Sequence, residues 1–182
     1  MNKTQNYFTC SLLLCLALAH NSLGNKGIYQ EPIDFIKETF NGAPPVAKKL
    51  WIKKEMQTKI RKIMDRKLKT LRLRYWTRDG RFAYILEEIG KEKPITVGFV
   101  VDSGKIERVK VLIFRETRGW EVRYPVFTDQ FKGATLKDNL KLDQDIDGIS
   151  GATLSLRALT KTARLALYLY QHCDNDHGES TN

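Results

Sequence analysis

Residues 147–170 read DGISGATLSLRALTKTARLALYLY, a short turn-forming segment followed at once by a long apolar one. From Leu154 to Tyr170 the chain has no glycine or proline. Apolar residues recur there at helical spacing, at Leu154, Leu156, Leu159, Ala163, Ala166, Leu167 and Tyr170. The sequence therefore predicts a long helix with one broad apolar face, which begins where the turn segment ends.

The residues just before this helix are glycines and hydroxyl-bearing residues. The first turn of a helix has backbone N–H groups without intrahelical partners, and the helix dipole favours negative charge there. Gly148 and Gly151 let the backbone bend and approach a ligand closely, while Ser150, Thr153 and Ser155 supply hydroxyls. The segment is therefore a candidate phosphate site. In the alternative interpretation Ser150 or Thr153 only caps the helix, which is the commoner role of such residues.

The pattern Asp147-x-x-Ser150-Gly151-Ala152-Thr153 resembles the flavinylation signature of the FMN-binding domain family. That family includes the C subunit of the sodium-translocating NADH:quinone reductase and the G subunit of the Rnf complex. In the family, a flavin transferase esterifies the phosphate of FMN onto the last threonine of the motif. The resemblance implies a covalent FMN on Thr153, with Asp147, Ser150, Gly151 and Ala152 as the sequence that the transferase recognises.

Three further blocks resemble the family in residue type and order. They are Gly104-Lys105-Ile106 with Val109 and Val111, then Glu116-Thr117-Arg118-Gly119, then Gln130-Phe131-Lys132-Gly133. Together with the motif they extend the resemblance over residues 97–170. It implies Glu116 and Thr117 as candidates for the flavin surroundings. Arg118 stands where family members often carry a proline.

The first 24 residues are typical of a signal peptide. Lys3 supplies one positive charge, residues 7–19 are almost wholly apolar, and cleavage is expected after Ala19 or Gly24. Those thirteen apolar residues are too few to cross a bilayer comfortably, for which about 20 are needed, although an anchor that extends to Leu23 is the alternative. We therefore expect export to the periplasm or another extracytoplasmic compartment, with membrane association as a further option.

Length and cysteine content give the expected domain organisation. Without the leader, the chain is long enough for one domain with a helical extension. We expect a basic helical segment over 25–70, the FMN-binding domain over 71–172 and a disordered tail over 173–182. Cys173 is the one cysteine outside the leader, which leaves no partner for an internal disulfide. The tail carries metal-ligand residue types at weakly indicative spacing, so we expect no metal site.

The positive charge of the chain is concentrated in one stretch. The formal net charge is +10, and residues 48–78 contain 13 basic residues against Glu55 and Asp65. Residues 46–64 are predicted to form a helix with an apolar stripe among lysines. Such a surface can steer association with an acidic redox partner, for example a cytochrome or a membrane oxidoreductase complex, or with an anionic membrane surface. A solvated charged face is the alternative, and the leader argues against nucleic acid as a partner.

From Leu71 the apolar period changes to that of strands. Alternation over 71–76 and 82–86 flanks the turn Asp79-Gly80, and a second pair of strands is predicted over 95–101 and 106–114. With a short helix over 33–40, the expected fold class is α+β. It comprises an antiparallel sheet of about four strands, an N-terminal basic helix and a long C-terminal helix after the flavin-attachment motif.

The segment 118–145 has no regular period but many aromatic residues. Trp120, Tyr124, Phe127 and Phe131 are too many to leave in water, so we expect this loop to fold over the sheet.

A second Gly-Ala-Thr-Leu at residues 133–136 is a rival attachment site. Lys132 replaces the serine of the motif there, and Lys137 and Asp138 follow where an apolar helix would be expected, so Thr135 ranks behind Thr153. Arg157, one turn beyond Thr153, can pair with a phosphate oxygen.

The sequence thus predicts an exported electron carrier with one covalent FMN and no catalytic residues of its own. Two alternatives stay open. One is a flavin-dependent reductase of a small acceptor, and the other is an unflavinylated interaction module that docks acidic partners through its basic helix.

Overall fold

The computed structural model describes residues 27–148 and 150–178, so that the predicted leader and Ile149 lie outside the described residues. Its centre is a five-stranded antiparallel sheet in which the strands lie side by side in the order of the sequence. The strands are β1 (Lys48–Trp51), β2 (Arg72–Arg78), β3 (Arg81–Ile89), β4 (Pro94–Asp102) and β5 (Lys105–Phe114).

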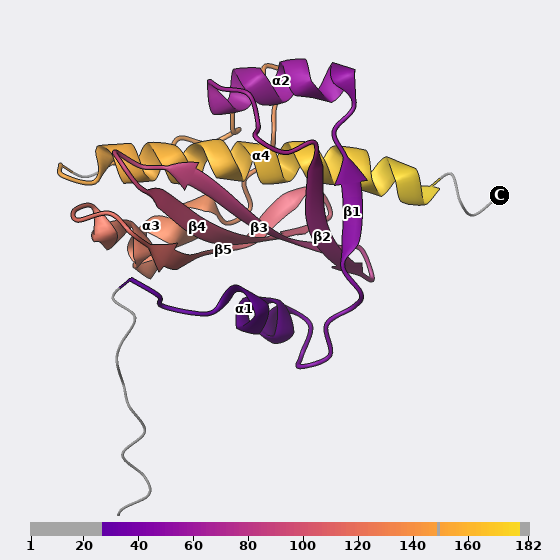
Figure 1. Ribbon diagram of the computed structural model, residues 1–182, viewed down its shortest axis with the longest axis horizontal. Helices are drawn as coiled ribbons and strands as arrows, with labels where there is room; N and C mark the ends of the chain where they lie inside the picture. Colours follow the sequence, from indigo (N-terminus) through magenta and orange to yellow (C-terminus); the bar gives the residue numbers. More distant parts are fainter. Residues whose placement is uncertain (1–26, 149, 179–182) are drawn as a thin grey trace, which may run out of the picture.

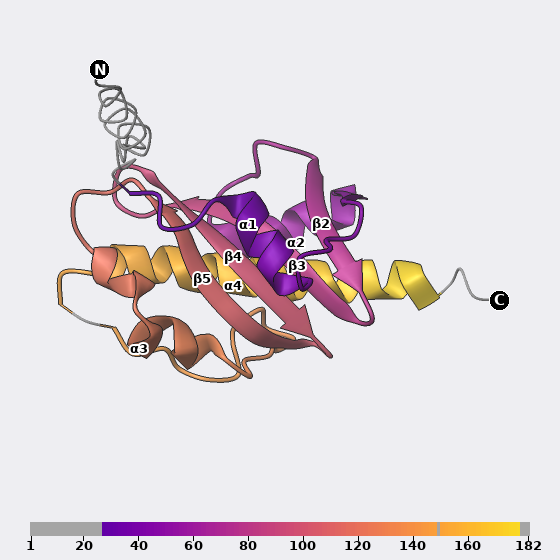
Figure 2. The same cartoon turned by 90° about the horizontal axis from the view of Figure 1, so that it is seen from below.

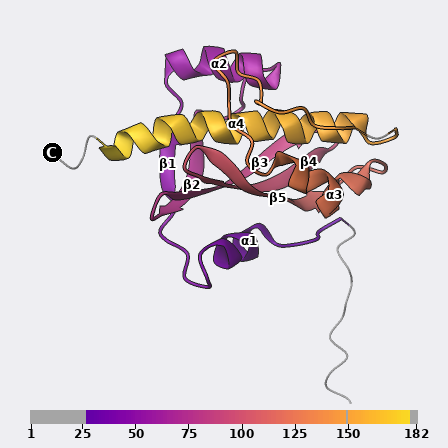
Figure 3. The same ribbon diagram turned by 180° about the vertical axis from the view of Figure 1, so that it is seen from behind.

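Helices cover both faces of this sheet. Helix α4 (Thr153–Gly178) runs along one face, and α1 (Pro32–Thr39) lies against β3 and β4 on the other (Figures 1 and 2). Helix α2 (Lys54–Met64) packs on the outer side of α4 (Figure 3). Because strand β4 is sandwiched between helices, all residues from Ile95 to Val101 are buried, without the alternation of a half-exposed strand.

The hydrophobic core has two parts that follow from this layering. The larger cluster lies between the sheet and helices α2 and α4, and the smaller one joins Phe35, Ile36 and Phe40 of the α1 region to β3, β4 and β5. Helix α1 approaches the sheet so closely that a Cβ at Gly98 would lie 2.6 Å from the ring of Phe35. Glycine is therefore required at this position of β4.

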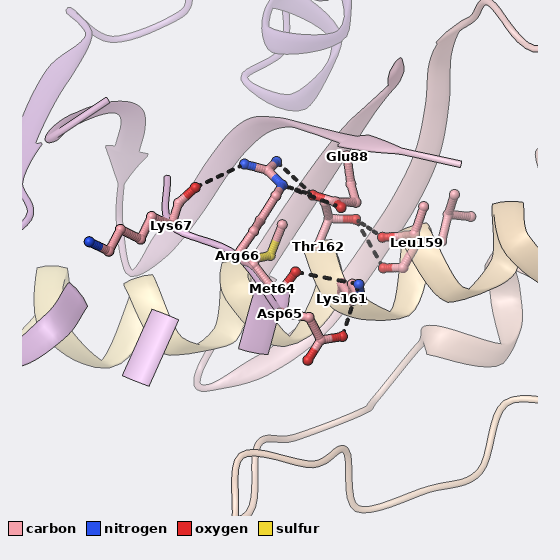
Figure 4. A network of polar contacts seen from close by, with 9 residues as sticks. Met64, Asp65, Arg66, Lys67, Glu88, Leu159, Lys161 and Thr162 are labelled. Carbon is pink, nitrogen blue, oxygen red and sulfur yellow. Dashed lines mark hydrogen bonds and ion pairs between the residues drawn. The ribbon is translucent and has the colours of Figure 1, made fainter. Parts of the chain in front are cut away.

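Two ion pairs join the residues directly after α2, Asp65 and Arg66, to the layers beneath the helix (Figure 4). Arg66 donates from two guanidinium nitrogens to Oε2 of the buried Glu88 on β3, at 2.7 and 3.1 Å. Lys161 of α4 contacts Asp65 at 3.0 Å and donates to the carbonyl of Met64. The C-terminal end of α2 is thus fixed to both the sheet and α4.

The predicted α+β class, the antiparallel sheet and the long C-terminal helix are confirmed. So are the helix over 33–40 and the turn at Asp79-Gly80, where both residues have positive φ, at 52° and 77°. None of the described helices is long and apolar enough to cross a membrane.

The single helix predicted over 46–64 is wrong over its first eight residues, 46–53. Residues 48–51 form strand β1, whose Leu50 pairs with Leu73 of β2 and is buried, and the helix begins only at Lys54. The backbone pairing available at the open edge of β2 outweighs the helical spacing of Leu50 and Trp51. The sheet therefore has five strands rather than about four.

Two further boundaries differ from the expectation. Helix α4 continues to Gly178, and Cys173, where the tail was expected to begin, is fully buried. The segment 118–145 contains the short helices η1 (Trp120–Arg123), α3 (Pro125–Thr128) and η2 (Asp129–Phe131). The segment packs against β5 as expected. Of its four aromatic residues only Phe131 is buried, so the loop covers its aromatic side chains only in part.

A candidate flavin site at the start of helix α4

An open pocket of about 620 Å³ lies where helix α4 begins. Three separate parts of the chain meet in its wall: the turn after β3, the loop after β5, and the first turn of α4. The lining residues are Lys91, Glu116, Thr117, Arg118, Gly151, Thr153, Leu154 and Ser155. The fold thus brings Glu116 and Thr117, predicted from one block of sequence, together with Gly151 and Thr153, predicted from another.

Thr153 is the first residue of the 26-residue helix and is exposed to solvent. The carbonyl of Ala152 accepts the first hydrogen bond of the helix, from the N–H of Leu156 at 2.9 Å. The N–H groups that precede Leu156 in this turn have no carbonyl one turn back inside the helix and are the natural donors to an anion. Thr153 therefore lies at the N-terminus of a long helix, as the sequence predicted.

Gly151 makes the sharp change of direction before the helix. Its φ is 92°, in the region that favours glycine, and a Cβ built on it would meet nothing within 4 Å. The backbone at Gly151 thus borders open space in the pocket wall. By contrast Ala152 is buried and lies outside the lining residues, so it fixes the turn from beneath.

The loop after β5 is pressed against the first turn of α4. Gly119 has φ of 81°, and a Cβ there would lie 2.6 Å from Oγ of Ser155. Ser155 itself is buried against this loop, so it forms part of the wall and does not present an exposed hydroxyl. The close contact holds Thr117 and Arg118 beside Thr153.

Glu116 organises the turn on the opposite side of the pocket. Its Oε1 accepts hydrogen bonds from the backbone N–H groups of Lys91, Glu92 and Lys93, at 2.5, 2.7 and 2.9 Å. Partial burial raises the pKa of the Glu116 carboxyl, but the three donors together outweigh it and the pKa lies below the ordinary value for glutamate. Glu116 is therefore an anchor for the turn that carries Lys91 into the pocket.

The other motif residues lie beside the pocket. Asp147 and Ser150 are exposed and are absent from the lining. The backbone of Asp147 is held by the side chain of Gln130, which accepts from its N–H at 2.7 Å and donates to its carbonyl at 3.4 Å. Gln130 belongs to another of the blocks that resemble the family, and its position explains how that block supports the motif. Arg157 is exposed and does not line the pocket.

Lys91, Arg118 and Leu154 are pocket residues that the sequence did not single out as site residues. Lys91 lies in a hairpin turn whose sequence has no distinctive pattern, and only the pairing of β3 with β4 places it opposite Thr153. Arg118 could have been found, since it interrupts the resemblance where a proline is usual. Among the described residues no group of three or more metal-ligand side chains comes together.

The residues present fit FMN, a flat aromatic group with a phosphate. The pocket volume falls within the roughly 300–1,000 Å³ usual for cofactor sites. Lys91 and Arg118 supply two positive charges, the start of α4 supplies backbone donors, and Leu154, 42% exposed, supplies an apolar surface.

Thr135, the rival threonine, is in a different environment. It is half-buried in a loop, and its N–H donates to the carboxylate of Asp143 at 2.8 Å. No described helix begins within several residues of it. Its surroundings therefore lack the donor-rich helix start that Thr153 has.

One of three comparisons with known proteins gave a match, and it covers the part of the chain that forms the pocket. No curated protein and no solved structure gave a significant match to the chain. Residues 90–168 match the family model described as FMN-binding domain, a range that contains every residue of the pocket lining. Over residues 90–168 the chain is therefore similar to the FMN-binding domain family, and this match supports FMN as the cofactor.

Proposed function

We propose that the protein is an exported electron-transfer flavoprotein that carries one FMN as a phosphoester on Thr153. The observation that carries the proposal is the position of Thr153 in the matched domain. It is exposed at the first residue of a long helix and lines a pocket large enough for the cofactor.

Each part of the pocket has a role in this function. The Oγ1 of Thr153 is the attachment atom, and the N–H groups of the first turn of α4 offset the charge of the phosphate. Lys91 and Arg118 place positive charge at the wall, which favours added negative charge in the pocket. When bound, FMN supplies the redox chemistry, while the protein supplies attachment, orientation and electrostatics.

Covalent attachment suits a protein that works outside the cytoplasm. A cofactor lost by dissociation could not readily be replaced there, whereas an ester keeps it on the chain. Export rests on the leader in the sequence, residues 1–24.

The redox partner in this proposal is an acidic protein, such as a cytochrome or a subunit of a membrane oxidoreductase complex. Helix α2 and the residue before it present five exposed cations, Lys53, Lys54, Lys59, Arg61 and Lys62, against one exposed acid, Glu55. A surface with mostly positive charges raises the association rate of a negatively charged partner. The flavin transferase is the second partner, since it must reach the exposed Thr153.

The attachment site is tested by two matched variants made in cells that contain a flavin transferase. Thr153→Ala should lose covalent flavin, seen as loss of flavin fluorescence from the denatured protein band, while Thr135→Ala should keep it. The Thr153→Ala domain should still fold, because loss of a helix cap costs about 1 kcal/mol. Covalent flavin that persists in Thr153→Ala would refute the assignment.

A further inference from the structure

An exposed aromatic cluster surrounds Arg123 beside the pocket. The guanidinium of Arg123 lies 4.3 Å from the ring centroid of Tyr29 and 5.1 Å from those of Trp120 and Tyr124. These three rings are 38%, 40% and 42% exposed, and the neighbouring Val126 is 67% exposed. We call these five residues the aromatic end. A single exposed apolar residue is ordinary, whereas a contiguous group indicates a contact surface.

The aromatic end is continuous with the wall of the flavin pocket. Trp120 directly follows Gly119, where an added Cβ would lie 2.6 Å from Oγ of Ser155 in the first turn of α4. Leu154, a pocket residue in that same turn, is itself 42% exposed. Whatever covers the aromatic end therefore also comes close to the mouth of the pocket.

The described chain begins at this same end of the molecule. Figures 1 and 2 show its first residues near the start of α4. The carbonyl of Gly27 accepts from the N–H of Phe114 at 2.7 Å, and Ile28 pairs with Ile113, so the chain is fixed to β5 two residues before Tyr29. The apolar run 7–19 ends eight residues before Gly27, a separation that spans at most about 28 Å of extended chain.

We propose that the aromatic end rests on the headgroup region of a lipid bilayer, and that the leader is kept as the anchor that is the alternative to its cleavage. Tryptophan and tyrosine favour this region because the ring is apolar and the polar edge can stay hydrated. Arg123 can keep its charge among headgroup phosphates while its stem covers apolar surface. The inference goes beyond the proposed electron carrier and does not require that flavin be attached.

In this orientation the basic residues of α2 are available to an acidic partner and do not face the membrane surface. Helix α2 lies on the outer side of α4, away from α1 and from the first described residues (Figures 1 and 3). With the aromatic end on the bilayer, the cations of α2 remain open to a partner in solution, and the pocket mouth stays near the membrane surface.

The experiment compares two exposed tryptophans of the chain, one in the aromatic end and one outside it. Of its three tryptophans, Trp120 and Trp51 are both exposed and both lie near an arginine, Trp51 at 5.8 Å from Arg72. The full chain is made without a transferase, so that no flavin quenches emission, and is reconstituted into phosphatidylcholine–phosphatidylglycerol vesicles. One variant, W51F/W76F, reports on Trp120 alone, and the other, W76F/W120F, reports on Trp51 alone.

The proposal predicts that brominated acyl chains remove most of the Trp120 emission and leave Trp51 unchanged, while aqueous iodide does the reverse. Quenching of Trp51 and not of Trp120 would overturn it, because the basic surface would then face the lipid. Absence of lipid quenching at both positions would also overturn it. In that case, a concentration-dependent dimer in light scattering would identify a second copy of the chain as the occupant. Far-UV circular dichroism of both variants establishes that each is folded.

Discussion

Glu116 shows how a single carboxylate can shape a pocket by holding a neighbouring turn in place. Its Oε1 is occupied by three backbone donors of the turn 91–93, and Gly90 packs against the same side chain. The resemblance implied Glu116 as part of the flavin surroundings, and the structure places it in the pocket lining. Its contacts assign it a supporting role there, with Lys91 as the residue it positions.

The lowered pKa of Glu116 gives a prediction for stability against pH. A carboxyl whose pKa is lower in the folded than in the unfolded state stabilises the fold above its unfolded pKa, and this contribution is lost as pH falls through the folded value. We expect Glu116→Gln to lower the melting temperature at pH 7, and the difference from the unmodified sequence to shrink as pH falls below about 4.3, the ordinary pKa of glutamate. Thermal unfolding of both proteins at a series of pH values measures it. A difference that stays constant down to the lowest pH would contradict the role of the charge.

Gly119 and Gly133 have the same backbone conformation but differ in the space around them. Both have φ of 81°, but a Cβ would lie 2.6 Å from Ser155 at Gly119 and would meet nothing within 4 Å at Gly133. Gly133→Ala should cost about 1–2 kcal/mol for the left-handed conformation alone. Gly119→Ala should cost a further 1–3 kcal/mol or so because the loop must move from α4. Urea unfolding gives both values, and equal costs would show that the loop and helix do not press together.

At the scale of elements, helix α2 depends on a buried ion pair at its C-terminal end. Glu88 is 7% exposed and accepts hydrogen bonds from two guanidinium nitrogens of Arg66, whereas Asp65, which pairs with Lys161, is 73% exposed (Figure 4). Removing one partner of a buried pair leaves an uncompensated charge. We expect Glu88→Gln to destabilise the fold by about 2 kcal/mol, since Arg66 can still reach water.

Asp65→Asn is the control, with an expected cost below about 1 kcal/mol because the aspartate is exposed. Chemical unfolding under the same conditions compares the two variants. Similar costs for both would mean that burial of Glu88 adds nothing to the ion pair.

The elements that the sequence predicted well are those with a long, uninterrupted period. The helix from Leu154 and the strands around Asp79-Gly80 depend on local spacing, and the structure confirms them. Strand β1 was missed because its four residues are too few to show alternation, and their conformation is set by pairing with β2. The place of Lys91 depends likewise on contacts between distant segments, which spacing along the chain does not reveal.

At the scale of the whole molecule, the charge is distributed unevenly around the fold. Helix α2, which carries exposed cations, lies on the outer side of α4, away from α1 and the first described residues (Figure 3). We therefore propose two separate binding surfaces, the cations of α2 for an acidic partner and the aromatic end for lipid.

This division predicts how electron transfer responds to charge reversal. The triple variant Lys54→Glu, Arg61→Glu and Lys62→Glu should slow electron transfer to a small acidic cytochrome and weaken its dependence on salt. Reversal of Lys132, Lys137 and Lys141, three exposed lysines outside α2, is the control with the same change of net charge. Stopped-flow rates at several salt concentrations measure both, and equal slowing would show that net charge, rather than the α2 surface, governs the association.

The most direct test of the account is the mass of the tryptic peptides from protein made together with a flavin transferase. Trypsin separates the two candidate threonines, because Thr153 falls in residues 142–157 and Thr135 in residues 133–137. Residues 142–157 are expected to gain the mass of one FMN less one water, with fragment ions that place the addition on Thr153. An unmodified peptide 142–157, or an adduct on residues 133–137, would contradict it.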